Sequence, residues 1–410
     1  MQNLIYVNKD RIKKHINSFA EYGKTSNGGV TRLALSNSDK KARDYFYQYC
    51  KGLGLIVEID DLGNIYATLK GKKEKPPIVI GSHLDTVVKG GRFDGVLGVV
   101  AGLEIIETLI EHDVTPEVPI TVVNFTNEEG VRFEPAMMSS GVLAGKFEKE
   151  KVMQTADREG ITFEQALKNI GYNGSESNRL QEATAFLELH IEQGPILEKQ
   201  NKTIGIVECV VGMTCYEIEV EGESNHAGTT PMSMRKDALF VTTDIISNLR
   251  KNLDKLDEKL VYTIGRLDVY PNLHTIIPEN VSFTIEARHK DMEIIKKVEN
   301  IIENIKSMQQ IDTTTLNVKK VWGRETVWFN EKFRKNIEDS ALKLGYSNMK
   351  ITSGAGHDAQ FIAEISPTAM IFVPSVDGRS HSEDEYTSLD DCYKGINVLL
   401  NTVIQILEES

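Results

Sequence analysis

Residues 118–130 read Val-Pro-Ile-Thr-Val-Val-Asn-Phe-Thr-Asn-Glu-Glu-Gly, an apolar run that ends in two adjacent carboxylates. A short, continuous apolar run of this kind is typical of a buried strand. Glu128 and Glu129 follow at the end of that strand, where neighbouring carboxylates repel each other and lose hydration. A cationic group nearby would relieve both costs. The stretch therefore predicts a buried strand with a cation bound close to its end.

The segments on either side alternate between strand-like and helix-like patterns. Strands are expected at residues 78–80, 120–125, 185–190 and 369–373, and helices at 41–53, 96–110 and 390–407. This alternation predicts an α/β sheet between helices, with the chemistry on loops at the strand ends.

The pattern changes between about residues 212 and 322. Strands are expected there at 216–220, 261–264, 281–285 and 315–318, and helices at 236–253 and 292–311. This β-α-β-β-α-β order is the split β-α-β, or ferredoxin-like, arrangement. We therefore predict a catalytic domain formed by residues 1–211 and 326–410, with residues 212–325 inserted as a second domain. Half-exposed edge strands can pair with a second copy, so the insert also predicts a homodimer.

Two polar loops upstream of Glu128 supply candidate metal ligands. Residues 81–86 read Gly-Ser-His-Leu-Asp-Thr, and residues 90–95 read Gly-Gly-Arg-Phe-Asp-Gly. Imidazole and carboxylate groups are the ligands of catalytic zinc, which keeps an open position for water. Asp94 opens a helix from a glycine-rich loop and is placed to bridge two metals. We expect the Asp85 carboxylate to accept the second ring N–H of His83, as carboxylates behind a ligand histidine do.

Further ligands are expected after later strands. His190 lies in residues 189–194 (LHIEQG) and His381 in residues 378–382 (GRSHS). A lone histidine is more often a hydrogen-bonded structural residue, and a lone Glu-Glu pair is more often a solvated surface. The shared placement of these residues on short Gly- or Ser-rich loops beside strands favours one metal site instead. Glu129 would complete one metal, and Glu128 would face the bound water as general base.

The bulk composition limits the partners. With 47 Lys and Arg against 60 Asp and Glu, the formal charge is −13, which argues against nucleic acid or an anionic membrane. The four cysteines form no C-x-x-C pair, as expected in a reducing compartment. The first nine residues lack a basic-then-apolar leader, and no apolar run approaches about twenty residues. We expect a cytoplasmic protein.

Short motifs extend over nearly the whole chain in one order. They are residues 28–34 (GGVTRLA), 81–86 (GSHLDT), 91–95 (GRFDG), 126–133 (TNEEGVRF), 190–194 (HIEQG), 225–232 (NHAGTTPM), 354–359 (GAGHDA) and 380–382 (SHS). Together they resemble the M20-type metallopeptidase superfamily. The resemblance is to its amidase branch, which contains N-carbamoyl-L-amino-acid hydrolases, β-ureidopropionases and allantoate amidohydrolases.

The resemblance implies a zinc-binding catalytic domain with an inserted dimerisation or lid domain. It implies two divalent metal ions, held by His83, Asp94, Glu129, His190 and His381, with Glu128 as the general base. Zinc, manganese and cobalt all accept such ligands. His226 would polarise the scissile carbonyl, commonly in the other subunit's site, and Arg288 would clamp a substrate carboxylate. The further substrate contacts that it implies are Gln193, Thr214, Thr275, Gly356 and His357.

The implied reaction is hydrolysis of an N-carbamoyl-L-amino or N-carbamoyl-β-amino acid to amino acid, carbon dioxide and ammonia. Thr275 stands where the family usually has Asn, and residues 213–215 (MTC) stand where allantoate-cleaving relatives tend to carry Gln and Arg. Residues 223–226 (ESNH) instead look like allantoate-cleaving members, while residues 134–138 (EPAMM) look like carbamoylases. Allantoate amidohydrolase is therefore the first alternative and an aminoacylase or dipeptidase the second. A metal-free scaffold protein is the non-enzyme alternative, although every ligand position is filled.

Overall fold

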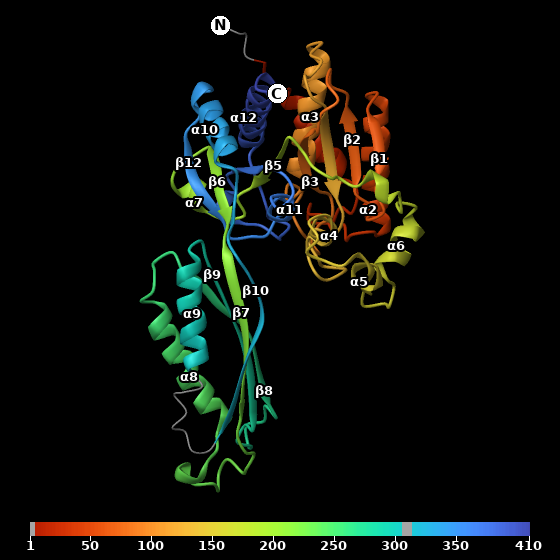
Figure 1. Cartoon of the computed structure of the whole chain (residues 1–410). Helices are drawn as coiled ribbons and strands as arrows, with labels where there is room; N and C mark the ends of the chain where they lie inside the picture. Colours follow the sequence, from red (N-terminus) through yellow and green to blue (C-terminus); the bar gives the residue numbers. More distant parts are fainter. Residues whose placement is uncertain (1–4, 306–313) are drawn as a thin grey trace. The chain divides into compact units, whose positions relative to one another are not determined.

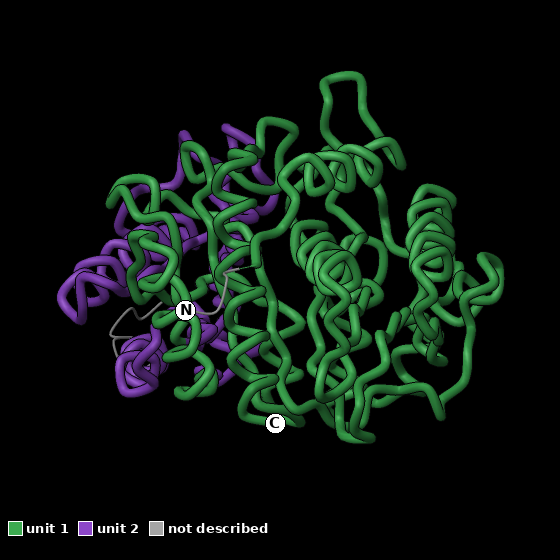
Figure 2. The backbone as a smooth tube through the Cα atoms, turned by 90° about the horizontal axis from the view of Figure 1, so that it is seen from above, with its two compact units in different colours: residues 1–208, 328–410 green, residues 209–327 purple. Residues whose placement is uncertain are grey.

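The computed structural model describes residues 5–305 and 314–410, and the chain forms two compact units (Figures 1 and 2). Unit 1 contains the residues up to Glu208 together with Trp328–Ser410, and unit 2 contains Cys209–Val327. The sequence placed these boundaries after residues 211 and 325. Unit 2 is thus inserted between the two parts of unit 1.

A nine-stranded mixed sheet forms the centre of unit 1. Its order is β1-β2-β4-β3-β5-β13-β6-β11, with β12 paired to β6. The strands are β1 (Ile56–Ile59), β2 (Ile65–Leu69), β3 (Ile78–His83), β4 (Ile120–Phe125), β5 (Ala185–Ile191), β6 (Ile204–Val210), β11 (Val327–Trp328), β12 (Asn348–Ser353) and β13 (Thr368–Val373). The four central strands β4, β3, β5 and β13 are parallel and fully buried. Full burial explains their continuous apolar sequences, because helices cover both faces of a parallel sheet.

Helices pack around this sheet and complete its core. The longer ones are α1 (Lys9–Ala20), α2 (Asn37–Gly52), α3 (Val96–Glu111), α10 (Glu331–Lys343) and α12 (Leu389–Glu408). The shorter ones are α4 (Met138–Leu143), α5 (Lys149–Gln154), α6 (Phe163–Ile170), α7 (Ile196–Lys199) and α11 (Asp358–Ile362). Helix α2 begins four residues before the predicted start, because the side chain of Ser36 accepts the backbone N–H of Asp39 and caps the helix there. The predicted α/β class is confirmed.

The described residues of unit 2 form a four-stranded antiparallel sheet with two α-helices. Its elements are β7 (Gly212–Glu221), α8 (Ala238–Leu253), β8 (Val261–Tyr270), β9 (Asn280–His289), α9 (Met292–Asn304) and β10 (Thr315–Arg324). The sheet order β10-β7-β9-β8 is that of the predicted split β-α-β arrangement. Strand β9 alternates between buried and half-buried residues, and its buried side packs with α8 and α9 in one apolar core. Residues 306–311 of the predicted second helix lie outside the described residues.

Among residues 5–305 and 314–410, no helix is both long and apolar enough to span a membrane.

Candidate metal centre

Four parallel strands bring the predicted ligands to one edge of the sheet in unit 1. His83 is the last residue of β3 and pairs in register with Phe125, three residues before Glu128. His190 lies one residue before the end of β5 and pairs with Phe372 of β13, the strand that leads to His381. The carboxyl ends of such strands are where ligands bind in α/β sheets.

The first group of potential ligands is buried and consists of His83, Asp94 and His190. Oδ1 of Asp94 lies 3.7 Å from Nε2 of His83 and 3.1 Å from Nε2 of His190. Gly95 permits this approach: its φ is +66°, and an added Cβ would lie 2.3 Å from Cε1 of His83. A residue with a side chain at position 95 would therefore displace the His83 ring.

The second group consists of Asp94, Glu129 and His381. Nε2 of His381 lies 3.4 Å from Oδ2 of Asp94 and 3.4 Å from Oε2 of Glu129. The two groups therefore share Asp94, which offers one carboxylate oxygen to each. A tetrahedral ion with ligand bonds of about 2.0–2.1 Å holds its ligand atoms roughly 3.4 Å apart, so these donor separations fit metal binding.

Both buried imidazoles are oriented by backbone carbonyl oxygens. Nδ1 of His83 lies 2.9 Å from the carbonyl oxygen of Asp85, and Nδ1 of His190 lies 2.9 Å from that of Ile191. A carbonyl oxygen can only accept, so each Nδ1 is the donor. Nε2 of each ring is therefore the atom that could bind a metal, and Nε2 of His190 here accepts the backbone N–H of Gly95 at 3.2 Å.

The predicted hydrogen bond from His83 to the Asp85 carboxylate is wrong. Nδ1 of His83 lies 3.8 Å from Oδ1 of Asp85. The Asp85 carboxylate instead accepts the backbone N–H groups of Glu128 and Glu129, at 3.2 Å each. The two donor residues lie 43 and 44 positions after Asp85 in the sequence, so local spacing gives no sign of these contacts. Asp85 thus positions the Glu128-Glu129 segment.

The side chains of Gln193 and Ser380 also contact Asp94, the residue shared by the two ligand groups. Nε2 of Gln193 lies 2.8 Å from Oδ2 of Asp94, and Oγ of Ser380 lies 3.0 Å from the same oxygen. The amide nitrogen of Gln193, expected at the substrate, is therefore directed at Asp94 in this structure.

Burial and charge perturb the acidic groups in opposite directions. Burial alone would raise the pKa of Asp94, but hydrogen bonds from His190 and His381 and the charges of His190 and His83 hold it well below its usual range. Burial and neighbouring carboxylates raise the pKa of Glu128 and Glu129 well above their usual values. Burial lowers the pKa of His190, yet Asp94 outweighs it and raises that pKa to about 9. This excess of buried carboxylates favours bound cations.

Removing the metal is expected to destabilise the protein more at about pH 8 than at about pH 5.5. At the lower pH, the carboxyl groups whose pKa is raised keep more of their protons. A carboxyl whose pKa is raised by folding stabilises the fold only while it is protonated. Above its usual pKa it progressively destabilises the metal-free fold, and a bound cation removes that cost. Asp94 stays ionised throughout this window because its pKa is lowered.

Thermal unfolding with and without a chelator at both pH values measures this difference. At free metal one hundred times its Kd, the stabilisation is about 2.7 kcal/mol. If the difference in Tm between the metal-bound and the chelator-treated protein does not change with pH, this account of Glu128 and Glu129 is wrong.

A third cluster of carboxylate and imidazole side chains adjoins the first ligand group. It contains Glu188 and His357 together with His190. Glu188 accepts the Ser82 hydroxyl at 2.7 Å and the Ala359 N–H at 3.1 Å, and Nε2 of His357 lies 3.0 Å from Oγ of Ser353. These contacts indicate polar support rather than another ion. The signal for Glu188 in the sequence is a charged residue within an apolar strand.

Gly356 and His357 lie on the loop between β12 and α11 in unit 1, and His357 is buried. Asp358, next in the chain, is also buried and lies in the GAGHDA motif, which by itself gave it no role. It accepts the Ser140 hydroxyl at 2.5 Å, and its charge contributes to the raised pKa of Glu128.

The other predicted residues lie in unit 2, in two places. His226 forms a β-bridge with Ile276, and the N–H of Ala227 donates to the carbonyl oxygen of Thr275. Arg288 lies near the far end of β9, where its register partner is Met213, beside the buried Thr214. Eight residues of strand, from position 280 to 288, span roughly 26 Å at about 3.3 Å per residue. His226 and Arg288 thus lie at opposite ends of unit 2.

Paired sites of histidine and carboxylate that share one aspartate, at the carboxyl edge of an α/β sheet, define a metal-dependent hydrolase. Residues 79–405 match the model of peptidase family M20/M25/M40, and the chain belongs to this metal-dependent family.

The relatives are similar over nearly their full length. The N-carbamoyl-L-amino-acid amidohydrolase of Pseudomonas sp. strain NS671 is 36% identical over 410 residues, covering 98% of this chain and 99% of that protein. The allantoate amidohydrolase of Bacillus subtilis is 33% identical, covering 97% and 98%. The crystal structure of a hydantoinase/carbamoylase family amidase from Burkholderia multivorans superposes with a TM-score of 0.92, at 38% identity and 98% coverage of both chains.

Proposed function

We propose that this chain hydrolyses N-carbamoyl-L-amino acids or N-carbamoyl-β-amino acids to the free amino acid, carbon dioxide and ammonia. The observation that carries this proposal is the sharing of Asp94 between two ligand groups, with Glu128 beside the first. The similarity to N-carbamoyl-L-amino-acid amidohydrolases supports the choice of substrate.

Two divalent ions, zinc in our proposal, would be held by the two groups. His83, Asp94 and His190 would bind one ion, and Asp94, Glu129 and His381 the other. Bound ions of this kind supply a nucleophilic water near neutral pH and an electrophile for the carbonyl oxygen. Metal analysis of the purified protein tests the number and identity of these ions. A protein that binds no metal would support the metal-free scaffold instead.

Glu128 is proposed to move the proton during hydrolysis. Its Oε2 lies 3.6 Å from Nε2 of His83, and the residue is only 8% exposed. Glu128 belongs to neither ligand group, so its carboxylate is available to accept a proton from the attacking water. It would then donate that proton to the departing nitrogen.

Arg288 is proposed to bind the substrate carboxylate. Arg288 and Arg324 both pair in register with Met213, so the two guanidinium groups come from the same row of the sheet. Burial and the charge of Arg288 lower the pKa of Arg324 to about 10. The Glu286 carboxylate already contacts Arg288, with Oε1 2.7 Å from Nε and 2.6 Å from Nη2. A substrate carboxylate would bind beside Glu286, since two guanidinium groups carry more positive charge than one carboxylate balances and a guanidinium fork matches a carboxylate. Thr214, Thr275, Gln193, Gly356 and His357 are proposed as further substrate contacts.

Arg288→Ala is expected to raise KM for carboxylate-bearing substrates while kcat changes less. Hydrogen bonds to a charged group contribute about 1.5–3 kcal/mol, which corresponds to roughly a ten- to hundred-fold higher KM. Steady-state kinetics on N-carbamoyl-L-methionine and on its amide, which lacks the charge, measure the effect. The amide serves as control because the variant should not discriminate against it. An unchanged KM for the acid would remove Arg288 from this role.

We further propose a cytoplasmic homodimer in which His226 serves the other copy's site. His226 and Arg288 lie at opposite ends of unit 2, so one copy of that unit does not bring both to one substrate. Exposed apolar side chains occur on the segments around His226: Met232, Met234, Phe240, Tyr270 and Leu273. An exposed apolar patch of this kind marks an interaction surface.

Allantoate is the second candidate substrate, favoured by the similarity to the Bacillus subtilis enzyme. Ammonia release from N-carbamoyl-L-methionine, N-carbamoyl-β-alanine and allantoate in parallel separates the candidates. A preference for either carbamoyl compound supports the proposal and distinguishes α- from β-amino acids. Allantoate alone would assign the second function. Inactivity on all three, with metal bound, would redirect the assignment to an aminoacylase or dipeptidase.

A further inference from the structure

We infer that Glu385 is a positioning residue that fixes the two loops carrying Asp94 and His381 for metal binding. The inference rests on the proposed metal centre. Glu385 lies on the segment between β13 and α12, is only 5% exposed and belongs to neither ligand group.

The carboxylate of Glu385 contacts both loops at once. Its Oε1 accepts the backbone N–H groups of Phe93 and Asp94, at 3.1 Å each. Its Oε2 lies 3.0 Å from Oγ of Ser380, which is itself 3.0 Å from Oδ2 of Asp94. Glu385 is thereby connected to the backbone of the shared ligand and to the residue immediately before His381.

The backbone around Asp94 is shaped to receive this carboxylate. A Cβ added to Gly91 would lie 2.0 Å from Oε1 of Glu385 and 2.2 Å from its Cδ. The turn therefore wraps the carboxylate so closely that a side chain at position 91 would displace Glu385. This packing is independent of the hydrogen bonds and indicates the same role.

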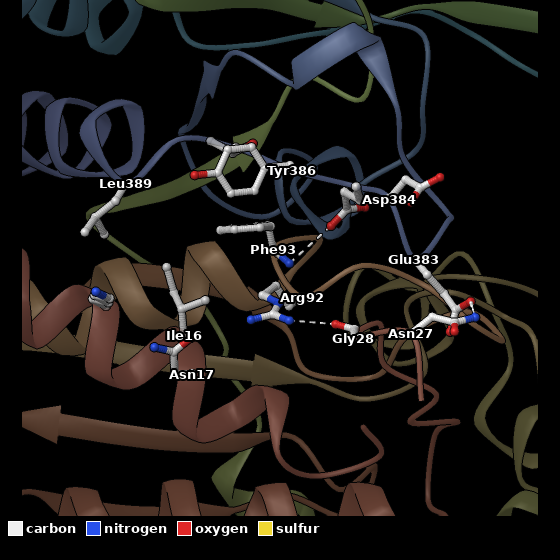
Figure 3. A pocket seen from close by; sticks show the side chains of 13 residues that line it. Ile16, Asn17, Asn27, Gly28, Arg92, Phe93, Glu383, Asp384, Tyr386 and Leu389 are labelled. Carbon is white, nitrogen blue, oxygen red and sulfur yellow. Dashed lines mark hydrogen bonds between the residues drawn. The ribbon is translucent and has the colours of Figure 1, made fainter. Parts of the chain in front are cut away.

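Glu385 also lines a cavity of about 460 Å³ in unit 1 (Figure 3). Figure 3 shows Phe93 in this cavity, with the hydrogen bond from its backbone nitrogen drawn as a dashed line. Arg92 and Glu383 also line the cavity, but their side chains contact residues 25–28 instead of the Asp94 turn. Arg92 donates to the carbonyl oxygen of Gly28 at 2.7 Å, and Glu383 accepts the amide of Asn27 at 2.9 Å. Glu383 therefore offers a matched control: it lies on the same segment as His381 and Glu385, but its carboxylate accepts from Thr25 and Asn27 instead of from the Asp94 turn.

Loss of the Glu385 carboxylate would leave the Asp94 turn without the acceptor for its two N–H groups. Because Asp94 is shared, a displaced turn weakens both metal positions. The proposed substrate groups of unit 2 are not involved. Groups that orient metal ligands typically contribute ten- to hundred-fold in metal affinity or activity, so an effect of roughly this size is expected.

The test titrates metal-free wild-type, Glu385→Ala, Glu385→Gln and Glu383→Ala proteins with zinc against a chromophoric chelator. Glu385→Ala should bind zinc roughly ten- to hundred-fold more weakly. Its kcat should recover with excess zinc while KM is unchanged. Glu385→Gln should remain close to wild type, because its amide oxygen still accepts both N–H groups and its amide nitrogen can donate to Ser380. Glu383→Ala should bind zinc as wild type does.

Gly91→Ala provides an independent perturbation that keeps the Glu385 side chain but displaces it. It should weaken zinc binding in the same direction, and it decides the question if Glu385→Ala is insoluble. Zinc affinity in Glu385→Ala or Gly91→Ala equal to wild type would overturn the inference, as would equal losses in Glu383→Ala and Glu385→Ala. Failure of the wild-type protein to bind two ions would instead overturn the proposed metal centre.

Discussion

Glu128→Gln is expected to lower kcat by about 10²–10⁴-fold, the usual contribution of a general acid–base group. Gln keeps the size and shape of Glu128 but cannot accept a proton from water or return it to the leaving nitrogen. Glu128 belongs to neither ligand group, so the metal content of the variant should match that of wild type. Elemental analysis and steady-state kinetics on the same preparation measure both quantities.

Glu129→Gln is the matched control for this experiment. It changes the neighbouring residue in the same way, but Glu129 lies in the second ligand group, 3.4 Å from His381. Glu129→Gln should therefore lose metal as well as activity, and excess metal should restore part of the activity. Near-normal turnover in Glu128→Gln would show that another group moves the proton. Loss of metal in Glu128→Gln would instead make Glu128 a ligand.

His226→Ala is expected to lower kcat by about 10²–10³-fold, which is typical for removing one donor to a developing oxyanion. The N–H of Gly228 donates to Nδ1 of His226 at 2.9 Å. In the neutral ring the proton must then be on Nε2, which can donate to a carbonyl oxygen. His226 is also exposed, as a residue that reaches a substrate in another subunit must be.

Mixed dimers decide where His226 acts. A dimer of one His226→Ala chain and one Glu128→Gln chain contains one intact site if His226 serves the other copy. The same dimer contains no intact site if His226 acts within its own chain. Random mixing of two inactive homodimers should therefore restore about a quarter of wild-type activity, because half of the dimers are mixed and each has one good site. Activity that stays at the level of the separate variants would refute action between subunits.

The sequence predicts the fold class and the order of elements well, because both depend on local patterns. The apolar runs of β3, β4, β5 and β13 are continuous since helices cover the sheet on both faces. The β-α-β-β-α-β order of unit 2 is also confirmed, and there the local pattern is alternation, as in β9, where buried and half-buried residues alternate. The miss at the start of α2 is also local: Ser36 caps the helix so that it begins at Asn37, four residues before the predicted start.

The ligand types could be predicted, whereas their supporting contacts could not. Spacing suggested that Asp85 would bind His83, but packing brought the Glu128-Glu129 backbone to that carboxylate. Glu385 follows His381 by only four residues, yet its hydrogen-bond partners Phe93 and Asp94 are almost three hundred positions away. Partners this distant depend on how loops pack at the sheet edge, which no local pattern encodes.

The sequence by itself determined which residues are chemically able to bind a metal and that they follow strands of one α/β sheet. Side-chain chemistry and strand periodicity are properties of short segments, so they can be read without coordinates. The sequence also placed Asp94 to bridge two metals, but only the tertiary structure decided which residues join it in each ligand group and that His226 and Arg288 lie at opposite ends of unit 2. Both facts depend on the register and order of strands far apart in the chain, and long-range packing sets these.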